Sequence, residues 1–259
     1  LWQIEGILKD HDVVFQPGVN EDLAATAIWG TQQANLSGKG KYDGVTSWWY
    51  GKGPGVDRSG DVLRHANLAG TSERGGVVAF FGDDHSCKSS TVPHQSEHVM
   101  IGCGIPILYP TSIQQILDLG VHAVAMSRFS GVWTSMKLVS EIVETSASVY
   151  VDSDRVIPVL PENVAMPEDG VNIRWPDHGI QQEERLYKYR LPAVLAYARE
   201  NELNQVTWHC PDARIGIVAS GKGYLDTIEA LRILGIEGET AQQLGLRVYQ
   251  VALIWPLEP

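Results

Sequence analysis

Residues 94–98 form the segment whose residue types and spacing most openly suggest chemistry. They match the HxxEH pattern, with His94, Glu97 and His98 at its fixed positions. On a helix the two histidines would share a face and could hold zinc, and Glu97 could act as a general base. Pro93 directly precedes the pattern, and no third ligand stands out. A zinc-dependent hydrolase is therefore an alternative, and the leading expectation is that no metal binds here.

Two glycine-rich segments could cradle a phosphate group through backbone N–H groups. Residues 51–55 read Gly-Lys-Gly-Pro-Gly, and residues 220–223 read Ser-Gly-Lys-Gly. Neither fits the P-loop or the dinucleotide-binding spacing. We expect the first to be a loop. We interpret the second as an ordinary turn between a strand and a helix.

Glu21 is an acid in the first turn of a predicted helix. Asn20 is of the residue type that caps helices, and it precedes a helical pattern over residues 21–35. A strand is predicted just before it, over residues 13–15. An acid in the first turn complements the helix dipole, as Asp22 also does. Spacing alone therefore predicts a helix-start residue and no more.

The elements around these residues alternate in the way that is typical of an α/β fold with a parallel sheet. A connector with short strands is expected over residues 151–175, where three prolines and scattered acids occur. Pro192 could interrupt a helix predicted over 181–200. The predicted strands are 45–50, 77–81, 105–108, 214–219 and 246–254, and the further predicted helices are 57–68, 112–119, 132–143 and 224–234.

Composition bounds the class of protein. The chain has 259 residues, 44% of them hydrophobic, and a formal net charge of −11. An acidic chain argues against nucleic-acid and anionic-membrane partners, and no apolar run approaches the ~18 residues of a spanning helix. The three cysteines, Cys87, Cys103 and Cys210, are far apart, so neither a disulfide framework nor an iron–sulfur site is predicted. A cytoplasmic protein is expected.

Several separated strings resemble the long, fused bacterial form of the indolepyruvate:ferredoxin oxidoreductases. The string at 14–24 is similar to the family segment that carries the glutamate of the thiamine site, and Glu21 stands at that position. The resemblance spans nearly the whole chain, and its strings occur in the family's order. The other matching strings are residues 50–58, 82–86, 89–91, 93–98 and 255–259.

The resemblance implies an α/β thiamine-diphosphate-binding fold of the pyrimidine type. Residues 1–150 would form that module, truncated at its N-terminal side, and residues 151–212 would form a connector. Residues 213–259 would begin a transketolase C-terminal-like domain. We therefore expect the chain to be an internal fragment of a larger enzyme.

The resemblance also implies roles for individual residues. Glu21 would hydrogen-bond the pyrimidine ring of thiamine diphosphate and act in catalysis, and Gly53 and Gly55 would help to bind the cofactor. A loop at the substrate end would bring further polar groups to a carboxylate or to the departing carbon dioxide. These candidate substrate residues are His85, Lys88 and Ser89.

The implied activity is the oxidative decarboxylation of a 2-oxoacid, indolepyruvate or another aryl pyruvate, to an acyl-coenzyme A with electrons passed to ferredoxin. Mg²⁺ and [4Fe-4S] clusters would be bound by parts of the enzyme outside this chain, so the chain alone is expected to be inactive. Coenzyme A, ferredoxin, the remaining domains and a second copy in a homo-oligomer are the expected partners. A non-catalytic docking module is the second alternative.

Overall fold

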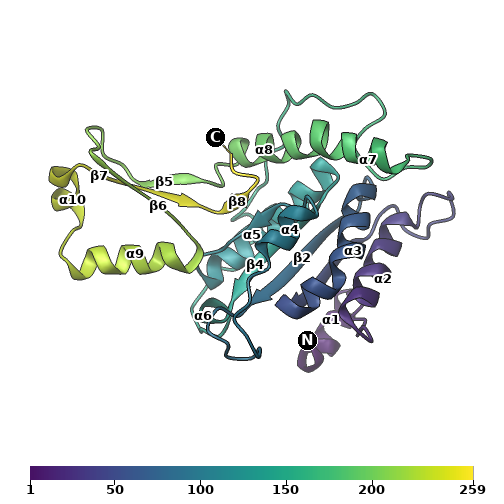
Figure 1. Ribbon diagram of the computed structural model, residues 1–259, viewed down its shortest axis with the longest axis horizontal. Coiled ribbons are helices and arrows are strands. Elements are labelled where there is room, and N and C mark those ends of the chain that lie inside the picture. The colour runs from purple at the N-terminus through teal and green to yellow at the C-terminus, as the bar shows by residue number, and fades with distance from the viewer. Residues whose placement is uncertain (259) are drawn as a thin grey trace.

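A computed structural model describes residues 1–258. A larger sheet has helices on both faces, and a smaller sheet extends to one side of it (Figure 1). Strands β1, β2, β4 and β3 of the larger sheet run parallel to their neighbours, whereas β8 pairs antiparallel to β3. This arrangement confirms the α/β class with a parallel sheet. The strands, in sheet order, are β1 (Thr46–Lys52), β2 (Gly76–Asp83), β4 (Trp133–Val139), β3 (Ile107–Leu108) and β8 (Leu253–Trp255).

Helices α2 and α3 lie on one face of the larger sheet with α4, and α5 and α8 lie on the other. Successive residues of β2 alternate between the faces, because side chains of a strand point to opposite sides. Val77 and Phe81 pack with the first group of helices and Val78 with the second. The helices are η1 (Trp2–Ile4), α1 (Glu5–Asp10), α2 (Glu21–Gln33), α3 (Gly53–Ala69), α4 (Glu97–Gly102), α5 (Ile113–Ser130), α6 (Ser140–Val143), α7 (Gly179–Arg185), the π-helical η2 (Leu186–Arg190) and α8 (Leu191–Glu200).

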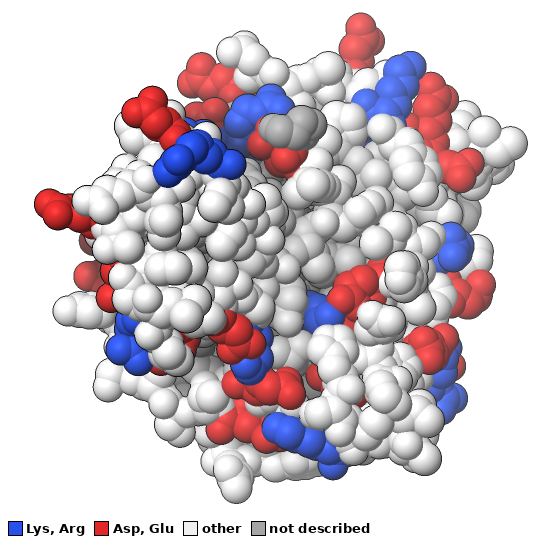
Figure 2. All heavy atoms as spheres, turned by 60° about the vertical axis from the view of Figure 1, so that its left-hand side comes forward, with Lys and Arg blue, Asp and Glu red and all other residues white. Residues whose placement is uncertain are grey.

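The smaller sheet has the strand order β5–β7–β6, with β5 antiparallel and β6 parallel to β7. Helices α9 and α10 cover one face through a small core around Leu231 and Val248. The other face is open, and Val218 is 69% exposed there. Acidic and basic side chains are interspersed on this side of the molecule, without a continuous basic patch (Figure 2). The elements are β5 (Gln205–Trp208), β6 (Ile215–Ser220), α9 (Gly221–Ile233), α10 (Gly238–Leu244) and β7 (Leu246–Val251).

Three predicted elements are wrong in type. The strand predicted at 13–15 is irregular: the Val13 N–H closes the end of α1 by donating to the Leu8 carbonyl at 2.8 Å, and Val14 is exposed. The loop predicted at 51–55 does not exist, because β1 continues to Lys52 and α3 begins at Gly53. Pro54 fits there, since the first turn of a helix does not need its N–H.

The helix predicted at 132–143 is mostly the central strand β4, followed by the single turn α6. Its residues are nearly all buried because β4 lies between β2 and β3 and is covered on both faces. A strand that is buried on both faces lacks the alternation of apolar and polar residues, so periodicity alone does not separate it from a buried helix.

The chain after β4 differs from prediction in smaller ways. Residues 144–178 contain neither helix nor strand, so the short strands expected in the connector are absent from this described segment. The helix predicted at 181–200 continues through Pro192, which lies in the first turn of α8 directly after the π-helical turn η2. The run predicted as one strand at 246–254 is two strands in two sheets, β7 and β8.

The helix α2 begins as predicted, with the Asn20 side chain accepting a hydrogen bond from the Leu23 N–H at 2.9 Å. Ser112 caps α5 in the same way through the N–H of Gln115. No helix among residues 1–258 combines the length and the apolar character that crossing a bilayer requires.

Candidate functional site

The candidate site lies at the carboxyl ends of the parallel strands, where ligands of open α/β sheets usually bind. β1 ends at Lys52, β2 at Asp83 and β4 at Val139. The register aligns these ends, since Lys52 pairs with Gly82 and Asp83 with Val139. Glu21 reaches this edge from the first position of α2.

Glu21 rests in a recess built from β1 and the start of α3, here called the Glu21 cradle and formed by Trp49, Gly51 and Gly55. The Trp49 indole N–H donates to the Glu21 backbone carbonyl at 3.0 Å. Cβ atoms added to Gly51 and Gly55 would lie 3.5 Å and 2.5 Å from the Glu21 Cγ. Only a residue without a side chain at position 55 therefore leaves room for this glutamate as it stands.

The charge around Glu21 is partly balanced by Arg58, which also projects from α3. The Arg58 Nε lies 2.9 Å from the Asp22 Oδ1 and 4.0 Å from the Glu21 Oε2. Arg58 therefore pairs more closely with Asp22 than with Glu21. Within residues 1–258 no group donates a hydrogen bond to the Glu21 carboxyl, which is 39% exposed. This carboxyl is free to receive an external polar group.

A set of charged side chains centred on the buried Asp83 and Lys137 lies on the same face of the sheet and is called here the Asp83 network. The Asp83 side chain accepts hydrogen bonds from the Ser96 N–H at 2.9 Å and the Ser96 hydroxyl at 2.7 Å. Lys137 of β4 places its Nζ 3.6 Å from Asp83 and in contact with the Glu97 carboxylate. The members are Asp57, Asp83, His94, Glu97 and Lys137.

The pKa values of two carboxyl groups in this network, Asp83 and Glu97, are shifted in opposite directions. Loss of solvent raises the pKa of Asp83 above its ordinary range, although Ser96 and Lys137 oppose the effect. Burial is the largest single effect on Glu97 and acts to raise its pKa, but the hydrogen bond and charge of Lys137, together with hydrogen bonds from the Glu97 backbone and Asp83, leave that pKa lowered. The network therefore raises the proton affinity of Asp83 and lowers that of Glu97, and Lys137 is the cation beside both carboxyl groups.

Tyr109 connects this network to the smaller sheet. The Lys137 Nζ lies 5.0 Å from the centroid of the Tyr109 ring, within cation–π range. On its other side the ring packs against Gly221, the first residue of α9, where a Cβ atom would overlap it. Gly221 also has a φ of +50°, so both its backbone and its surroundings favour glycine. The turn at 220–223 thus joins a strand to a helix, as the sequence predicts.

The loop between β2 and α4, residues 84–96, folds around the Asp84 carboxylate. That carboxylate accepts hydrogen bonds from the backbone N–H groups of Lys88, Ser89 and Ser90 at 2.8, 2.6 and 3.0 Å. These bonds, with Ser89 contributing most, lower the pKa of Asp84. The loop is tied to β1 as well, because the Lys52 Nζ donates to the Ser89 carbonyl at 2.7 Å.

The predicted site residues are therefore only partly together. Glu21 and Gly55 are in direct contact, and Ser89 is attached to Lys52 at the same end of β1. Gly53 instead makes room for the His94 ring. Lys88 reaches toward Glu144 at 4.0 Å, and His85 is exposed. The substrate roles predicted for His85, Lys88 and Ser89 stay predictions.

The HxxEH segment does not form the helical arrangement that a zinc site of this type needs. Helix α4 begins at Glu97, so His98 is helical and His94 is not. The His94 Nε2 lies 3.0 Å from the Asp57 Oδ2, and its Nδ1 lies 4.0 Å from Asp83. His94 thus belongs to a charge network, and within residues 1–258 no group of three or more His, Cys, Asp or Glu side chains is arranged to hold a metal ion.

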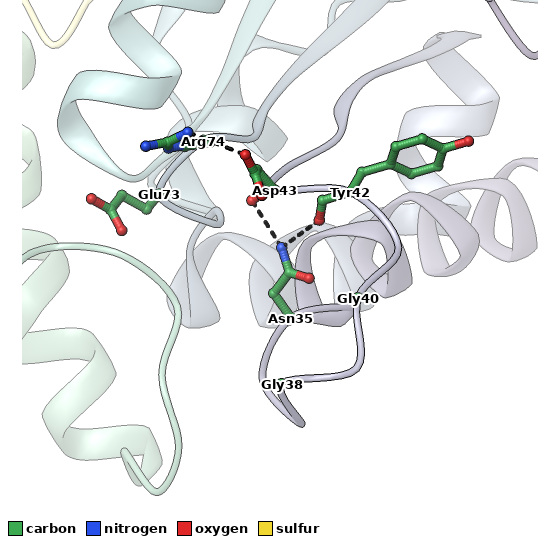
Figure 3. Close-up of a pocket in the computed structure, with 7 residues that line it drawn as sticks. All are labelled: Asn35, Gly38, Gly40, Tyr42, Asp43, Glu73 and Arg74. Atoms are coloured by element: carbon green, nitrogen blue, oxygen red, sulfur yellow. Dashed lines mark hydrogen bonds and ion pairs between the residues drawn. The ribbon is translucent and has the colours of Figure 1, made fainter.

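A hollow of about 330 Å³ lies elsewhere, at the amino ends of β1 and β2 (Figure 3). Its polar groups already satisfy one another: Asn35 donates to the Tyr42 and Asp43 carbonyls, and Arg74 pairs with Asp43 at 3.2 Å. The opposite end of the sheet carries Glu21. We therefore locate the candidate site by its side chains rather than by this hollow. The residues around the hollow are Asn35, Gly38, Gly40, Tyr42, Asp43, Glu73 and Arg74.

Sequence reasoning missed Trp49 and Lys137. Trp49 lies in the predicted strand at 45–50, and its N–H contact with Glu21 joins segments 28 residues apart. Lys137 fell within the predicted helix at 132–143. A usable signal was present, since a lysine within a stretch that is otherwise uncharged and buried must find a partner.

Comparison with known proteins identifies relatives of this chain. Residues 205–259 match the family model of the indolepyruvate oxidoreductase domain. Subunit IorA of indolepyruvate oxidoreductase from Methanothermobacter thermautotrophicus is 24% identical over 240 residues, covering 90% of this chain and 36% of that protein. The IorA subunit from Pyrococcus abyssi is 26% identical over 184 residues, covering 66% of this chain and 26% of that protein.

A solved structure has the same fold over almost the whole chain. It is a 2-oxoglutarate:ferredoxin oxidoreductase from Magnetococcus marinus with 2-oxoglutarate, coenzyme A and succinyl-CoA bound, with a TM-score of 0.63 and 13% identity. The match covers 98% of this chain and 48% of that one. The chain spans about a third of the length of the Methanothermobacter relative. Together these matches confirm the resemblance to the indolepyruvate oxidoreductase family that the sequence predicts.

Proposed function

We propose that this relative of the indolepyruvate oxidoreductases contributes the catalytic glutamate, Glu21, to a thiamine-diphosphate-dependent 2-oxoacid:ferredoxin oxidoreductase. The observation that carries the proposal is the Glu21 cradle. The Glu21 side chain lies at the C-terminal end of β1. Trp49 holds the Glu21 backbone, and Gly55 leaves space beside the side chain. A merely structural first-turn acid would not need a glycine to be accommodated.

The residues present fit one end of thiamine diphosphate. The pyrimidine ring offers a basic nitrogen, and Glu21 offers a carboxyl that has no hydrogen-bond donor within residues 1–258 and is accessible from outside. Bound thiamine diphosphate supplies a carbon nucleophile and an electron sink for the carbon dioxide lost from a 2-oxoacid. Glu21 would hold a proton at the carboxyl oxygen that faces the ring nitrogen and so promote the reactive tautomer of the ring.

The other residues of the site would support the role of Glu21 as the group that holds this proton. Arg58 is held by Asp22, which limits its pairing with Glu21. The Asp83 network and the loop at 84–96 fix the floor of the same sheet edge, because Ser96 and Lys52 attach the loop to it. Ser89, His85 and Lys88 are proposed to meet the substrate carboxylate from this loop.

The wider function follows the relatives. We propose an aryl pyruvate, indolepyruvate in particular, as substrate, with coenzyme A as acyl acceptor and ferredoxin as electron acceptor. Mg²⁺ and [4Fe-4S] clusters would be bound by regions outside this chain, which forms part of a homo-oligomeric cytoplasmic enzyme. The division into residues 1–150, 151–212 and 213–259 belongs to this proposal. The chain by itself would catalyse no turnover.

The test uses the enzyme that contains this chain together with the regions carried by its longer relatives. Ferredoxin reduction is measured with coenzyme A and indolepyruvate, phenylpyruvate, pyruvate or 2-oxoglutarate. We expect the aryl pyruvates to be preferred and Glu21→Gln to lower kcat by about 10²–10⁴-fold. Glu5→Gln, which removes an exposed acid paired with Lys9, is the control. Full activity of Glu21→Gln, or no oxidation of any aryl pyruvate, would contradict the proposal.

A further inference from the structure

We infer that Gly55 and Trp49 are positioning residues for Glu21, a role that rests on the function proposed above. Gly55 is not needed for its own backbone conformation, because it lies in the first turn of α3 with ordinary helical geometry. Glycine is a poor helix residue compared with alanine. Its presence at this buried position therefore calls for a spatial reason.

The spatial reason is the side chain of Glu21. A Cβ on Gly55 would lie 2.5 Å from the Glu21 Cγ, 3.0 Å from its Cδ and 3.2 Å from its Oε1. Real Cβ atoms do not approach carbon this closely, so alanine at position 55 would force the glutamate into another rotamer. The Glu21 carboxyl would then point in a direction different from the one that Gly55 permits.

Trp49 fixes the position of the Glu21 backbone. Its side chain is buried, with the residue 1% exposed, and its N–H donates to the Glu21 carbonyl at 3.0 Å. The strand carrying Trp49 is itself held by β2 through a continuous register. Trp49 thus fixes the position of the Glu21 backbone relative to the sheet. Gly55 of α3 determines the direction of the Glu21 side chain.

Two matched controls exist in the same chain. Gly60 lies on α3 as well, and a Cβ there would meet only Val99 Cγ1 at an ordinary 3.8 Å. Trp133 is as buried as Trp49, but its indole N–H has no hydrogen-bond partner within the described chain. Gly60→Ala and Trp133→Phe therefore repeat the chemical change without touching Glu21.

The test compares Gly55→Ala with Gly60→Ala, and Trp49→Phe with Trp133→Phe, in the complete enzyme loaded with thiamine diphosphate. Three quantities are measured: the rate of deuterium exchange at the thiamine C2, the thermal midpoint, and the Glu21 rotamer in a crystal structure of each variant. We expect Gly55→Ala to turn the Glu21 side chain and slow exchange by about 10²-fold, since small misplacements of catalytic groups have effects of this size. Gly60→Ala should keep the rotamer and the rate.

Trp49→Phe keeps the inference testable if Gly55→Ala does not fold. It should slow exchange severalfold, up to about tenfold, more than Trp133→Phe at a comparable thermal midpoint, because the loss of a neutral hydrogen bond has an effect of this size. Unchanged rotamer and exchange in Gly55→Ala, or equal exchange in the two tryptophan variants, would overturn the inference. Glu21→Gln is run alongside. Wild-type exchange in that variant would instead remove the proposed function itself.

Discussion

The Asn20 side-chain oxygen accepts a hydrogen bond from the Leu23 N–H across 2.9 Å, and Glu21 stands between these two residues as the first residue of α2. The cap thus does more than end a helix. It fixes the turn from which the candidate catalytic carboxyl projects toward the end of β1. Stability and site geometry therefore depend on the same contact.

Replacing Asn20 by alanine should lower the free energy of unfolding by about 1 kcal/mol, because one N–H of the first turn loses its partner. Urea denaturation of the chain measures this change. Asn20→Asp retains an acceptor and should stay close to wild type. An alanine variant as stable as wild type would show that solvent satisfies the N–H equally well.

Arg190 should be the most sensitive charged residue for stability. Its guanidinium donates to the carbonyl oxygens of Val171, Asn67, Leu68 and Ala69, so it joins the connector to the C-terminal end of α3. Burial lowers its pKa to about 9, which still leaves it charged at neutral pH. The negative end of the α3 dipole also favours a cation here.

Arg190→Met should therefore cost about 3–5 kcal/mol, since several buried carbonyls lose their donor together. Chemical denaturation provides the measurement. Arg199→Met removes an exposed arginine that pairs with Glu258 and should change stability by less than ~1 kcal/mol. Equal effects of the two substitutions would contradict the role given to Arg190.

Asp84 predicts a pH dependence of stability. Its pKa is lowered from the ordinary value of 3.8, first by the Ser89 N–H and further by those of Lys88 and Ser90. A carboxyl with a lowered pKa in the folded state stabilises the fold above pH 3.8 and loses this contribution as the pH falls through the folded-state value. Asp84→Asn should thus be less stable than wild type at pH 7, and the difference should shrink below pH 3.8.

Thermal melts of wild type and Asp84→Asn at several pH values between neutral and acid test this expectation. Asp61→Asn is the control, because the Asp61 side chain is 92% exposed and pairs with His65 at 3.6 Å. A stability difference between wild type and Asp84→Asn that is independent of pH would refute the ionic role of Asp84.

Much of the fold could be predicted because local patterns coincide with tertiary demands. Asn20 correctly predicts the start of α2, and the compact apolar run at 77–81 forms part of β2. The unit from β6 through α9 to β7 also follows its sequence pattern. In each case the residue types that favour an element also bury the correct face.

The failures have tertiary causes. Whether residues 133–139 form a strand depends on the neighbours β2 and β3, which are far away in sequence. Residues 51–55 look like a loop because they are rich in glycine, yet Gly53 and Gly55 are small in order to admit His94 and Glu21. A sequence states that a residue is small, but it does not state what occupies the space.

The candidate site was predictable to the same extent. Glu21 could be selected through its resemblance to a family segment, whereas Lys137 and Trp49 could not, since their roles consist of contacts between distant segments. The Lys137–Asp83 pair joins two adjacent strands 54 positions apart in the chain. Such a pair becomes visible only when the register of β2 and β4 is known.

The central claim is that Glu21 acts as the proton-holding carboxyl of a thiamine site. The most direct test is the rate of deuterium exchange at the C2 position of thiamine diphosphate bound to the complete enzyme, measured for wild type and Glu21→Gln beside a thermal melt. Glutamine preserves size and can still hydrogen-bond, but it holds no transferable proton. We expect exchange to be slowed by about 10²–10⁴-fold with stability changed by no more than ~1 kcal/mol. Wild-type exchange in a slightly less stable variant would contradict it and leave Glu21 as an ordinary helix-start acid.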